Sequence, residues 1–247
     1  MLRTNRLGLR IGGVTIVDDV SLEVIDGEFL VIIGPNGAGK TTLFNLITGI
    51  ARPTSGSIEI DGHDVTRAAP YRRARLGLGR TFQTSTIFVG LTVLENARLA
   101  AQAYLGGSAA LWRLAESETG PLERARRAVA MVGLETRATS LAGSLSHGEK
   151  RKLDLAILLC GEPRIVLLDE PTAGMAMEDV PEMVELIRRI HRDEGKTVLM
   201  VEHRMDLVMG LADRMAVMHH GSLLALDTPE RIVANQAVQA AYLGDPL

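Results

Sequence analysis

The amino-acid sequence predicts an α/β fold with a parallel core sheet, a flanking antiparallel sheet and an inserted helical subdomain. Three short runs of almost wholly apolar residues, 29–33, 164–168 and 197–201, are typical of buried parallel strands. Alternating apolar and polar residues on either side of the first run are typical of antiparallel strands. Between the first and second runs, residues 86–144 follow a helical pattern rich in Ala, Arg and Glu.

The antiparallel strands are expected before and after the first core strand. Residues up to about Ile25 alternate between apolar and polar, with Val20, Leu22 and Val24 on one face. Residues 57–60 alternate in the same way and end at the turn Asp61-Gly62. We expect these segments to pair beside the core sheet.

The core strand at 29–33 leads into the sequence GPNGAGKTT, which fits the phosphate-loop pattern G-x-x-x-x-G-K-[ST]. Its glycines let backbone N–H groups face phosphates at the positive end of the following helix. Lys40 adds positive charge for the outer phosphates, and the Thr41 hydroxyl can reach Mg²⁺. A purely structural glycine turn does not need Lys-Thr at this point. We therefore expect ATP to bind Gly34, Pro35, Asn36, Gly37, Ala38, Gly39, Lys40, Thr41 and Thr42.

The helical stretch contains its own start and stop signals. Thr92 and Glu95 have the spacing of a capping box, which predicts a helix that begins after Thr92. Gly106-Gly107 and Gly120-Pro121 are expected to divide the stretch into separate helices.

The core strand at 164–168 is followed by two acids, Asp169 and Glu170. An acid at a strand end beside a phosphate loop can hold Mg²⁺, so Asp169 is the predicted metal-binding acid. The adjacent Glu170 can orient and deprotonate an attacking water. A solvated strand end would explain one acid, but it does not explain a pair in this position.

The pentapeptide LSHGE opens a further predicted helix. Ser146 and Glu149 have capping-box spacing, so by itself this segment is explained by capping. Together with the phosphate loop and the acid pair, however, it resembles the signature of the ABC-transporter ATPases. The resemblance implies that Ser146 and Gly148 face the γ-phosphate of ATP bound to a second subunit.

Three further segments complete the resemblance. Gln83 is similar to the glutamine that connects the metal site with the helical subdomain, which implies a metal-binding and catalytic role. His203, in Val-Glu-His, is similar to the histidine that contacts the γ-phosphate. Residues 173–176 match the loop that crosses to the partner subunit.

The family implies one ABC ATPase domain over residues 1–247, with a P-loop NTPase core and antiparallel β subdomain at 1–85 and 145–247. The inserted helical subdomain is expected at 86–144. The implied catalytic residues are Glu170, His203, Gln83 and Lys40, and the implied metal site contains Thr41, Gln83 and Asp169.

Several segments also resemble one branch of the family, the branched-chain or hydrophobic amino-acid uptake ATPases. They are residues 9–14, 79–83, 91–96 and the ending AYLG. The urea/amide uptake ATPases belong to the same wider group, with a similar histidine at position 147, and the ending also resembles lipopolysaccharide-export ATPases. The expected partners are transmembrane permease subunits, a second ABC ATPase subunit that is identical or related, and, indirectly, a substrate-binding protein.

Two positions depart from the family pattern. Ile11 stands where an aromatic residue usually stacks on adenine, so we expect adenine to be bound by weaker aliphatic packing. Ala176 replaces an acid that is common in the loop that crosses to the partner, so communication across the dimer would rely on backbone groups.

Composition restricts the other classes of function. The formal net charge of −3, from 27 basic and 30 acidic residues, gives no basic footprint for nucleic acid. No apolar stretch reaches the ~20 residues of a membrane span, and the N-terminus lacks the apolar segment of a signal peptide. The single cysteine, Cys160, lies in an apolar run and is expected to be buried. We expect a soluble cytoplasmic protein that reaches the inner face of the membrane through its permease.

Two other functions stay open at this point. A soluble ABC protein that acts on DNA or ribosomes predicts coiled-coil insertions or tandem cassettes, but the stretch 84–144 shows no sustained heptads. A regulatory module that binds ATP without hydrolysing it is disfavoured by Glu170 and His203. We also expect the apolar cluster Ile87, Phe88, Val89 and Leu91 to dock a membrane subunit, with packing inside the helical subdomain as the alternative.

Overall fold

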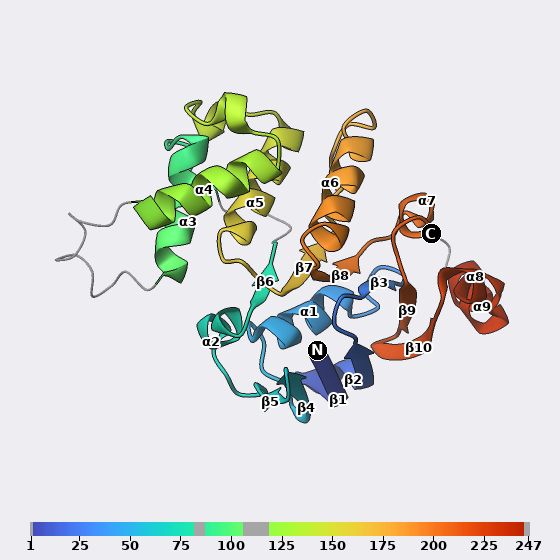
Figure 1. Ribbon diagram of the computed structural model, residues 1–247. Coiled ribbons are helices and arrows are strands. Elements are labelled where there is room, and N and C mark those ends of the chain that lie inside the picture. Colours follow the sequence, from blue (N-terminus) through green and yellow to red (C-terminus); the bar gives the residue numbers. More distant parts are fainter. Residues whose placement is uncertain (1, 82–86, 106–118, 245–247) are drawn as a thin grey trace. The chain divides into compact units, whose positions relative to one another are not determined.

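The computed structural model describes residues 2–81, 87–105 and 119–244, and these form two compact units (Figure 1). The first unit contains Met1–Arg80, Arg164–Glu170 and Arg188–Leu247, and the second contains Thr81–Pro163 and Pro171–Ile187. This division by contacts places residues 145–163 with the helical stretch. The subdomain boundaries that we expected from the sequence stay a prediction.

The first unit is built on a six-stranded sheet with the order β10-β9-β3-β8-β7-β6 (Figure 1). The strands from β9 to β6 run parallel, and β10 pairs antiparallel with β9 at one edge. Every residue of β3, β7 and β8 is buried, which confirms the three predicted core strands. Their bounds are β3 Phe29–Ile33, β6 Leu78–Arg80, β7 Ile165–Asp169, β8 Thr197–Val201, β9 Arg214–His219 and β10 Ser222–Asp227.

The parallel register brings several chain segments to one edge of this sheet. Ile32 at the end of β3 pairs with Val201, and Val201 in turn pairs with Asp169 at the end of β7. The residues that follow these three strands therefore leave the sheet on the same side. Loops at the carboxyl ends of parallel strands are where α/β proteins place ligands.

A four-stranded antiparallel sheet with the order β2-β1-β4-β5 completes the β structure of this unit, as predicted. Its inward side chains, such as Leu7 and Val20, share one apolar core with Leu43 and Phe44 of α1 (Lys40–Thr48). The core thus holds the helix behind the phosphate loop against both sheets. The strands are β1 Leu2–Ile11, β2 Val14–Val24, β4 Ser55–Ile60 and β5 His63–Asp64.

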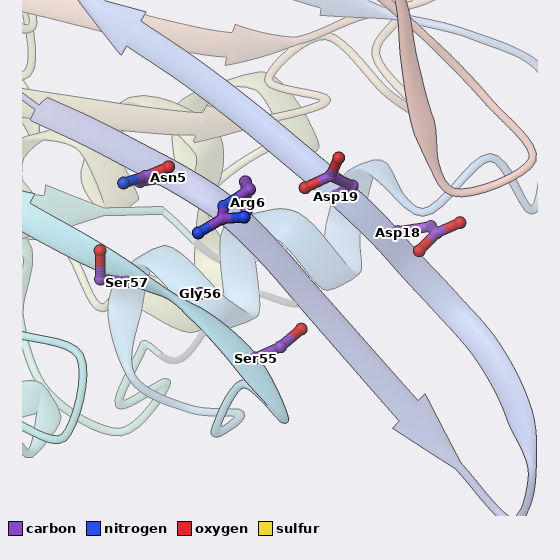
Figure 2. Close-up of a pocket in the computed structure, with 7 residues that line it drawn as sticks. All are labelled: Asn5, Arg6, Asp18, Asp19, Ser55, Gly56 and Ser57. Carbon is purple, nitrogen blue, oxygen red and sulfur yellow. The ribbon is translucent and has the colours of Figure 1, made fainter.

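The antiparallel sheet carries a shallow groove of about 470 Å³ (Figure 2). Register shifts in β1 coincide with left-handed backbone at Arg6, Asp19 and Gly56. Gly56 is required there, because a Cβ would lie 2.2 Å from the Arg6 carbonyl oxygen. The groove involves none of the predicted site residues, and it is lined by Asn5, Arg6, Asp18, Asp19, Ser55, Gly56 and Ser57.

A buried arginine closes the C-terminal end of α1. Arg73, on α2 (Pro70–Arg75), is 1% exposed, and its Nη1 donates to the carbonyl oxygens of Leu46 and Ile47 at 2.6 and 2.7 Å. The last carbonyls of a helix lack partners within the helix and attract positive charge. Arg73 therefore belongs to the scaffold of α1.

The second unit is helical. It contains α3 (Val93–Tyr104), α4 (Thr119–Met131), α5 (His147–Leu159), the short helices η2 (Glu135–Arg137) and η3 (Ala142–Ser144), and the first part of α6 (Val180–Arg192). The capping box at Thr92 is present. Gly120-Pro121 lie in the first turn of α4, where proline lacks only an N–H that needs no partner, so they mark the start of a separate helix. The other expected break, Gly106-Gly107, lies outside the described residues.

The first unit also contains three short helices, α7 (Met205–Val208) before β9, and α8 (Pro229–Ala234) and α9 (Gln236–Gly244) after β10. Cys160, in the second unit, is buried as expected, and this burial raises the pKa of its thiol to about 11. Among the described residues, no helix is long and apolar enough to cross a membrane.

Candidate nucleotide site

The phosphate loop curls between β3 and α1 through left-handed glycines. Gly37 and Gly39 have φ values of 80° and 94°, and Gly34 has 150°. A Cβ on Gly34 would lie 2.2 Å from the Met218 carbonyl oxygen, and one on Gly39 would lie 2.8 Å from the carbonyl oxygen of Ile16. Neighbouring backbone thus leaves room for glycine alone, which is the arrangement a phosphate cradle requires.

Lys40 begins α1 and points back onto the loop. Its Nζ donates to the carbonyl oxygens of Gly34 at 2.6 Å and Pro35 at 2.9 Å, and the residue is only 8% exposed. Burial lowers the pKa of Lys40, and the charges of Glu170 and Asp169 oppose this effect. The ammonium therefore lies inside the loop and near both acids. Thr41 is exposed, and Thr42 is half-buried.

The two predicted acids have different surroundings. Asp169 ends β7 and is 3% exposed, and its Oδ2 accepts a hydrogen bond from Arg80 Nη2 at 2.7 Å. Glu170 is half-buried and has a φ of 48°. This left-handed backbone, which is costly for a residue with a Cβ, is held by the bond from Glu170 N–H to the Val201 carbonyl oxygen. Strained backbone of this kind clusters at functional sites.

His203 follows β8, next to the strand that carries the acids. Its backbone N–H donates to Glu202 Oε2 at 2.9 Å, and its Nδ1 lies 3.6 Å from the same oxygen. The Glu202 side chain is 1% exposed, whereas that of His203 is 62% exposed. A buried carboxylate thus anchors the residue whose ring faces solvent.

The signature residues lie in the second unit. Glu149 N–H donates to Ser146 Oγ at 3.1 Å, and Ser146 N–H donates to Glu149 Oε2 at 2.8 Å, so the capping box is formed. Gly148 is buried, and a Cβ there would lie 2.9 Å from Asp179 Oδ2. The signature therefore packs against the segment after Ala176 within this unit. Capping explains the Ser146 hydrogen bonds, and the role of Ser146 toward ATP stays a prediction.

The position predicted for adenine packing lies at a hairpin. Ile11 is 61% exposed at the end of β1, and Val14 at the start of β2 is 60% exposed. Two apolar side chains thus project from one β turn in the first unit. The remaining predicted residue, Gln83, lies outside the described residues.

Two residues in the first unit touch this site and were not predicted. Arg80 contacts Asp169, as above. Tyr242 on α9 has a hydrogen bond with the backbone of Gly34, and burial raises its pKa to about 12 while that bond opposes the rise. Both residues had been noted only as parts of segments that carry the family resemblance, Arg80 in 79–83 and Tyr242 in the ending AYLG.

The donors present fit ATP and Mg²⁺. Gly34 and Gly39 of the loop have no room for a Cβ, Lys40 supplies a buried cation, and Asp169 supplies a buried carboxylate oxygen at the same sheet edge. Oxygen ligands such as these suit Mg²⁺, which retains several waters when it binds through one carboxylate. The arrangement can therefore hold a nucleotide with its metal.

A fold of this kind, with a phosphate loop, a strand-end acid pair and a capped signature helix, defines an ABC-type ATPase. The family model described as "ABC transporter" matches residues 17–173, well over half of the chain. The chain belongs to the ABC transporter ATPase family and is an ATP-hydrolysing transporter subunit. This result confirms the predicted fold class and the general function.

The curated relatives are similar over almost the whole chain. The protein LivG of Salmonella typhimurium, named "High-affinity branched-chain amino acid transport ATP-binding protein", is 39% identical over 99% of this chain and 98% of its own. BraF of Pseudomonas aeruginosa, which has the same description, is 37% identical with the same coverage. The family model "Branched-chain amino acid ATP-binding cassette transporter" matches residues 222–246.

Solved structures agree with the fold. A nucleotide-free ATP-binding cassette from an ABC transporter superposes with a TM-score of 0.85 at 29% identity and covers 99% of both chains. An ADP conformation of a cassette gives the same values. A dimeric bacterial cassette gives a TM-score of 0.79 at 25% identity and covers 93% of this chain and 99% of its own.

Proposed function

We propose that this chain powers the import of branched-chain or other hydrophobic amino acids. The observation that carries the proposal is the identity of 39% with LivG and 37% with BraF, over nearly the full length of this chain and of each relative. The match of the C-terminal segment, residues 222–246, to the branched-chain amino-acid family supports the same branch. Membrane subunits and a substrate-binding protein would select the substrate itself.

Each site residue of the first unit would have its own role in ATP hydrolysis. Lys40 would leave the Gly34 and Pro35 carbonyls and bind the outer phosphates, whose charge suits a buried ammonium. Glu170 would accept the proton of the attacking water, and His203 would contact the γ-phosphate. When bound through Thr41 and Asp169, Mg²⁺ would neutralise charge on the phosphates. Gln83 is proposed as a further contact to the metal site.

The second subunit would complete the site. Ser146 stands at the N-terminus of α5, where the helix dipole favours an anion. We propose that Ser146 and Gly148 of one subunit face the γ-phosphate held by the other. The dimeric cassette among the solved relatives supports this arrangement. ATP binding then closes the dimer, and hydrolysis reopens it.

The permease would dock on an exposed apolar patch of the second unit, defined by Phe88, Val89 and Leu141. Their exposures are 61%, 60% and 54%, and Gly143 N–H donates to the Val89 carbonyl oxygen at 3.0 Å. Buried Asn96 holds Phe88 by both backbone groups, at 2.8 and 3.0 Å. The backbone is thus fixed while the side chain faces solvent, as a docking surface requires. This contact would place the chain on the inner face of the membrane.

Reconstitution tests the substrate. The complex that co-purifies with this chain should be placed in vesicles with its binding protein, and uptake of leucine, valine, urea and acetamide should be compared at fixed ATP. ATP-dependent uptake of leucine or valine supports the proposal. Uptake of urea or acetamide alone would assign the chain to the urea/amide group. Extraction of lipid from the vesicles would instead assign it to the exporters.

A further inference from the structure

The described part of the chain contains a second buried arginine that contacts α1, and its position differs from that of Arg73. Arg80 ends β6, and its side chain is 6% exposed. Its Nη1 donates to Asn45 Oδ1 at 2.7 Å and to Thr48 Oγ1 at 3.3 Å, both on α1. The guanidinium also lies 5.5 Å from the centre of the Phe44 ring. Three residues of the phosphate-loop helix therefore hold Arg80.

The other end of the same guanidinium engages the acid. Arg80 Nη2 donates to Asp169 Oδ2 at 2.7 Å, and both side chains are almost fully buried. A buried carboxylate with a guanidinium partner has little freedom to rotate about its last bond. Arg80 thus sets which carboxylate oxygen of Asp169 is directed away from the pair.

We propose that Arg80 is a positioning residue of the metal site, which fixes Asp169 against the phosphate-loop helix. The inference rests on the proposed role of Asp169 in holding Mg²⁺. Lys40 does not fill this role, because its Nζ donates to the carbonyls of Gly34 and Pro35 in this structure and is proposed to turn to the phosphates when ATP binds. Arg80 thus joins Asp169 at the end of β7 with Asn45 and Thr48 of the phosphate-loop helix.

The consequence concerns the metal rather than the nucleotide. Groups that orient a metal-binding side chain typically contribute about 10- to 100-fold to metal affinity or activity. Loss of Arg80 should therefore weaken Mg²⁺ binding while the phosphate loop keeps its own contacts with ATP. Arg73 provides a comparison, because it is also a buried arginine but donates its hydrogen bonds to backbone carbonyls, including those of Leu46 and Ile47 on α1.

The test measures the binding of β,γ-imido-ATP to the full chain, with EDTA and with increasing MgCl₂, in the parent, Arg80→Met and Arg73→Met. Bound Mn²⁺ is followed by electron paramagnetic resonance in the same samples. In Arg80→Met the affinity in EDTA should stay within about twofold of the parent. The Mg²⁺ concentration that gives half of the metal-dependent increase in nucleotide affinity should rise about tenfold. Arg73→Met should melt at a lower temperature with an unchanged Mg²⁺ requirement.

A second variant keeps the test valid if Arg80→Met does not fold. Arg80→Lys retains the charge but lacks the fork that reaches Asn45 and Asp169 together, so its Mg²⁺ requirement should also rise. In an Asp169→Asn background, Arg80→Lys should produce no further change. A Mg²⁺ requirement equal to that of the parent in folded Arg80 variants would overturn the positioning role of Arg80 and leave the metal role of Asp169 in place. A parent that gains nothing from Mg²⁺ would overturn the metal role of Asp169, and the inference with it.

Discussion

The ammonium of Lys40 donates a hydrogen bond to the carbonyl oxygen of Gly34 at 2.6 Å, so the lysine expected to bind phosphate is bonded to the first residue of its own loop. Replacement by Met should remove charge-assisted bonds to ATP worth about 1.5–3 kcal/mol, or roughly 10- to 100-fold in affinity. Calorimetry on Lys40→Met, with Lys196→Met as the control, measures this loss. An affinity equal to that of the parent would remove Lys40 from the phosphate site.

The lowered pKa of Lys40 gives this prediction a pH dependence. Because the pKa is lower in the folded chain than in the unfolded one, Lys40 becomes neutral at a lower pH when folded. Stability of the nucleotide-free chain should therefore rise with pH between the folded and unfolded pKa values. ATP affinity should fall over the same range, since ATP needs the charged form, and this fall should be absent in Lys40→Met.

Glu170→Gln should separate binding from hydrolysis. The substitution keeps the shape of the side chain but removes the base, which should reduce turnover by about 10²–10⁴. ATP affinity should remain, because Glu170 makes none of the proposed phosphate contacts. Glu162 is a suitable control: it is an exposed acid with the same φ of 48°, but it lies in the second unit. Steady-state hydrolysis that persists in Glu170→Gln but not in Glu162→Gln would reverse the assignment.

Local patterns were enough to predict much of this molecule. The core strands were found because the runs 29–33, 164–168 and 197–201 are almost wholly apolar, and β7 differs from its prediction by one residue. Both capping boxes were found because their spacing is local. The glycines of the phosphate loop were readable for the same reason. Each of these features depends on residues within one turn or one strand.

Contacts between distant segments were not predictable in this way. Arg80 and Asp169 are separated by 89 positions, and nothing near either residue indicates that they pair. The same holds for Tyr242 and Gly34, which lie near opposite ends of the chain.

ATP should control dimer formation. In the Glu170→Gln background, which hydrolyses slowly, ATP should convert the chain from monomer to dimer in light scattering. Ser146→Arg should block the dimer by placing bulk and charge at the proposed phosphate contact. Thr92→Arg is the matched control, because it removes an equivalent capping residue worth about 1 kcal/mol from α3. Dimers in Ser146→Arg would exclude the signature contact, and a monomer in every sample would exclude a homodimer.

Charge on the docking patch should uncouple the chain from its permease. Phe88→Glu places a carboxylate where the proposed interface is apolar, whereas Val233→Glu changes a residue of α8 that is 46% exposed. We expect Phe88→Glu to lose co-purification with the permease while the ATPase activity of the isolated chain remains. Both variants should melt within a few degrees of the parent. A large fall in the melting temperature of Phe88→Glu alone would indicate that the Phe88 side chain packs within the helical unit.

Ile11 should make the site tolerant of the base. The phosphate contacts do not distinguish ATP from GTP, and Ile11, which is 61% exposed, offers aliphatic packing instead of an aromatic ring. Stacking of a base on an aromatic side chain is worth about 1–3 kcal/mol in single-stranded nucleic-acid sites. We therefore expect weak discrimination between ATP and GTP in the parent, and tighter ATP binding in Ile11→Tyr.

Val14 supplies the control for this prediction, because it is 60% exposed on the other side of the same turn. Calorimetry with ATP and GTP on Ile11→Tyr and Val14→Tyr shows which side chain meets the base. Tighter ATP binding in Val14→Tyr but not in Ile11→Tyr would indicate that Val14, rather than Ile11, lies next to the adenine. Strong ATP preference in the parent, unchanged in both variants, would show that another residue recognises adenine, since neither apolar side chain could then supply the discrimination.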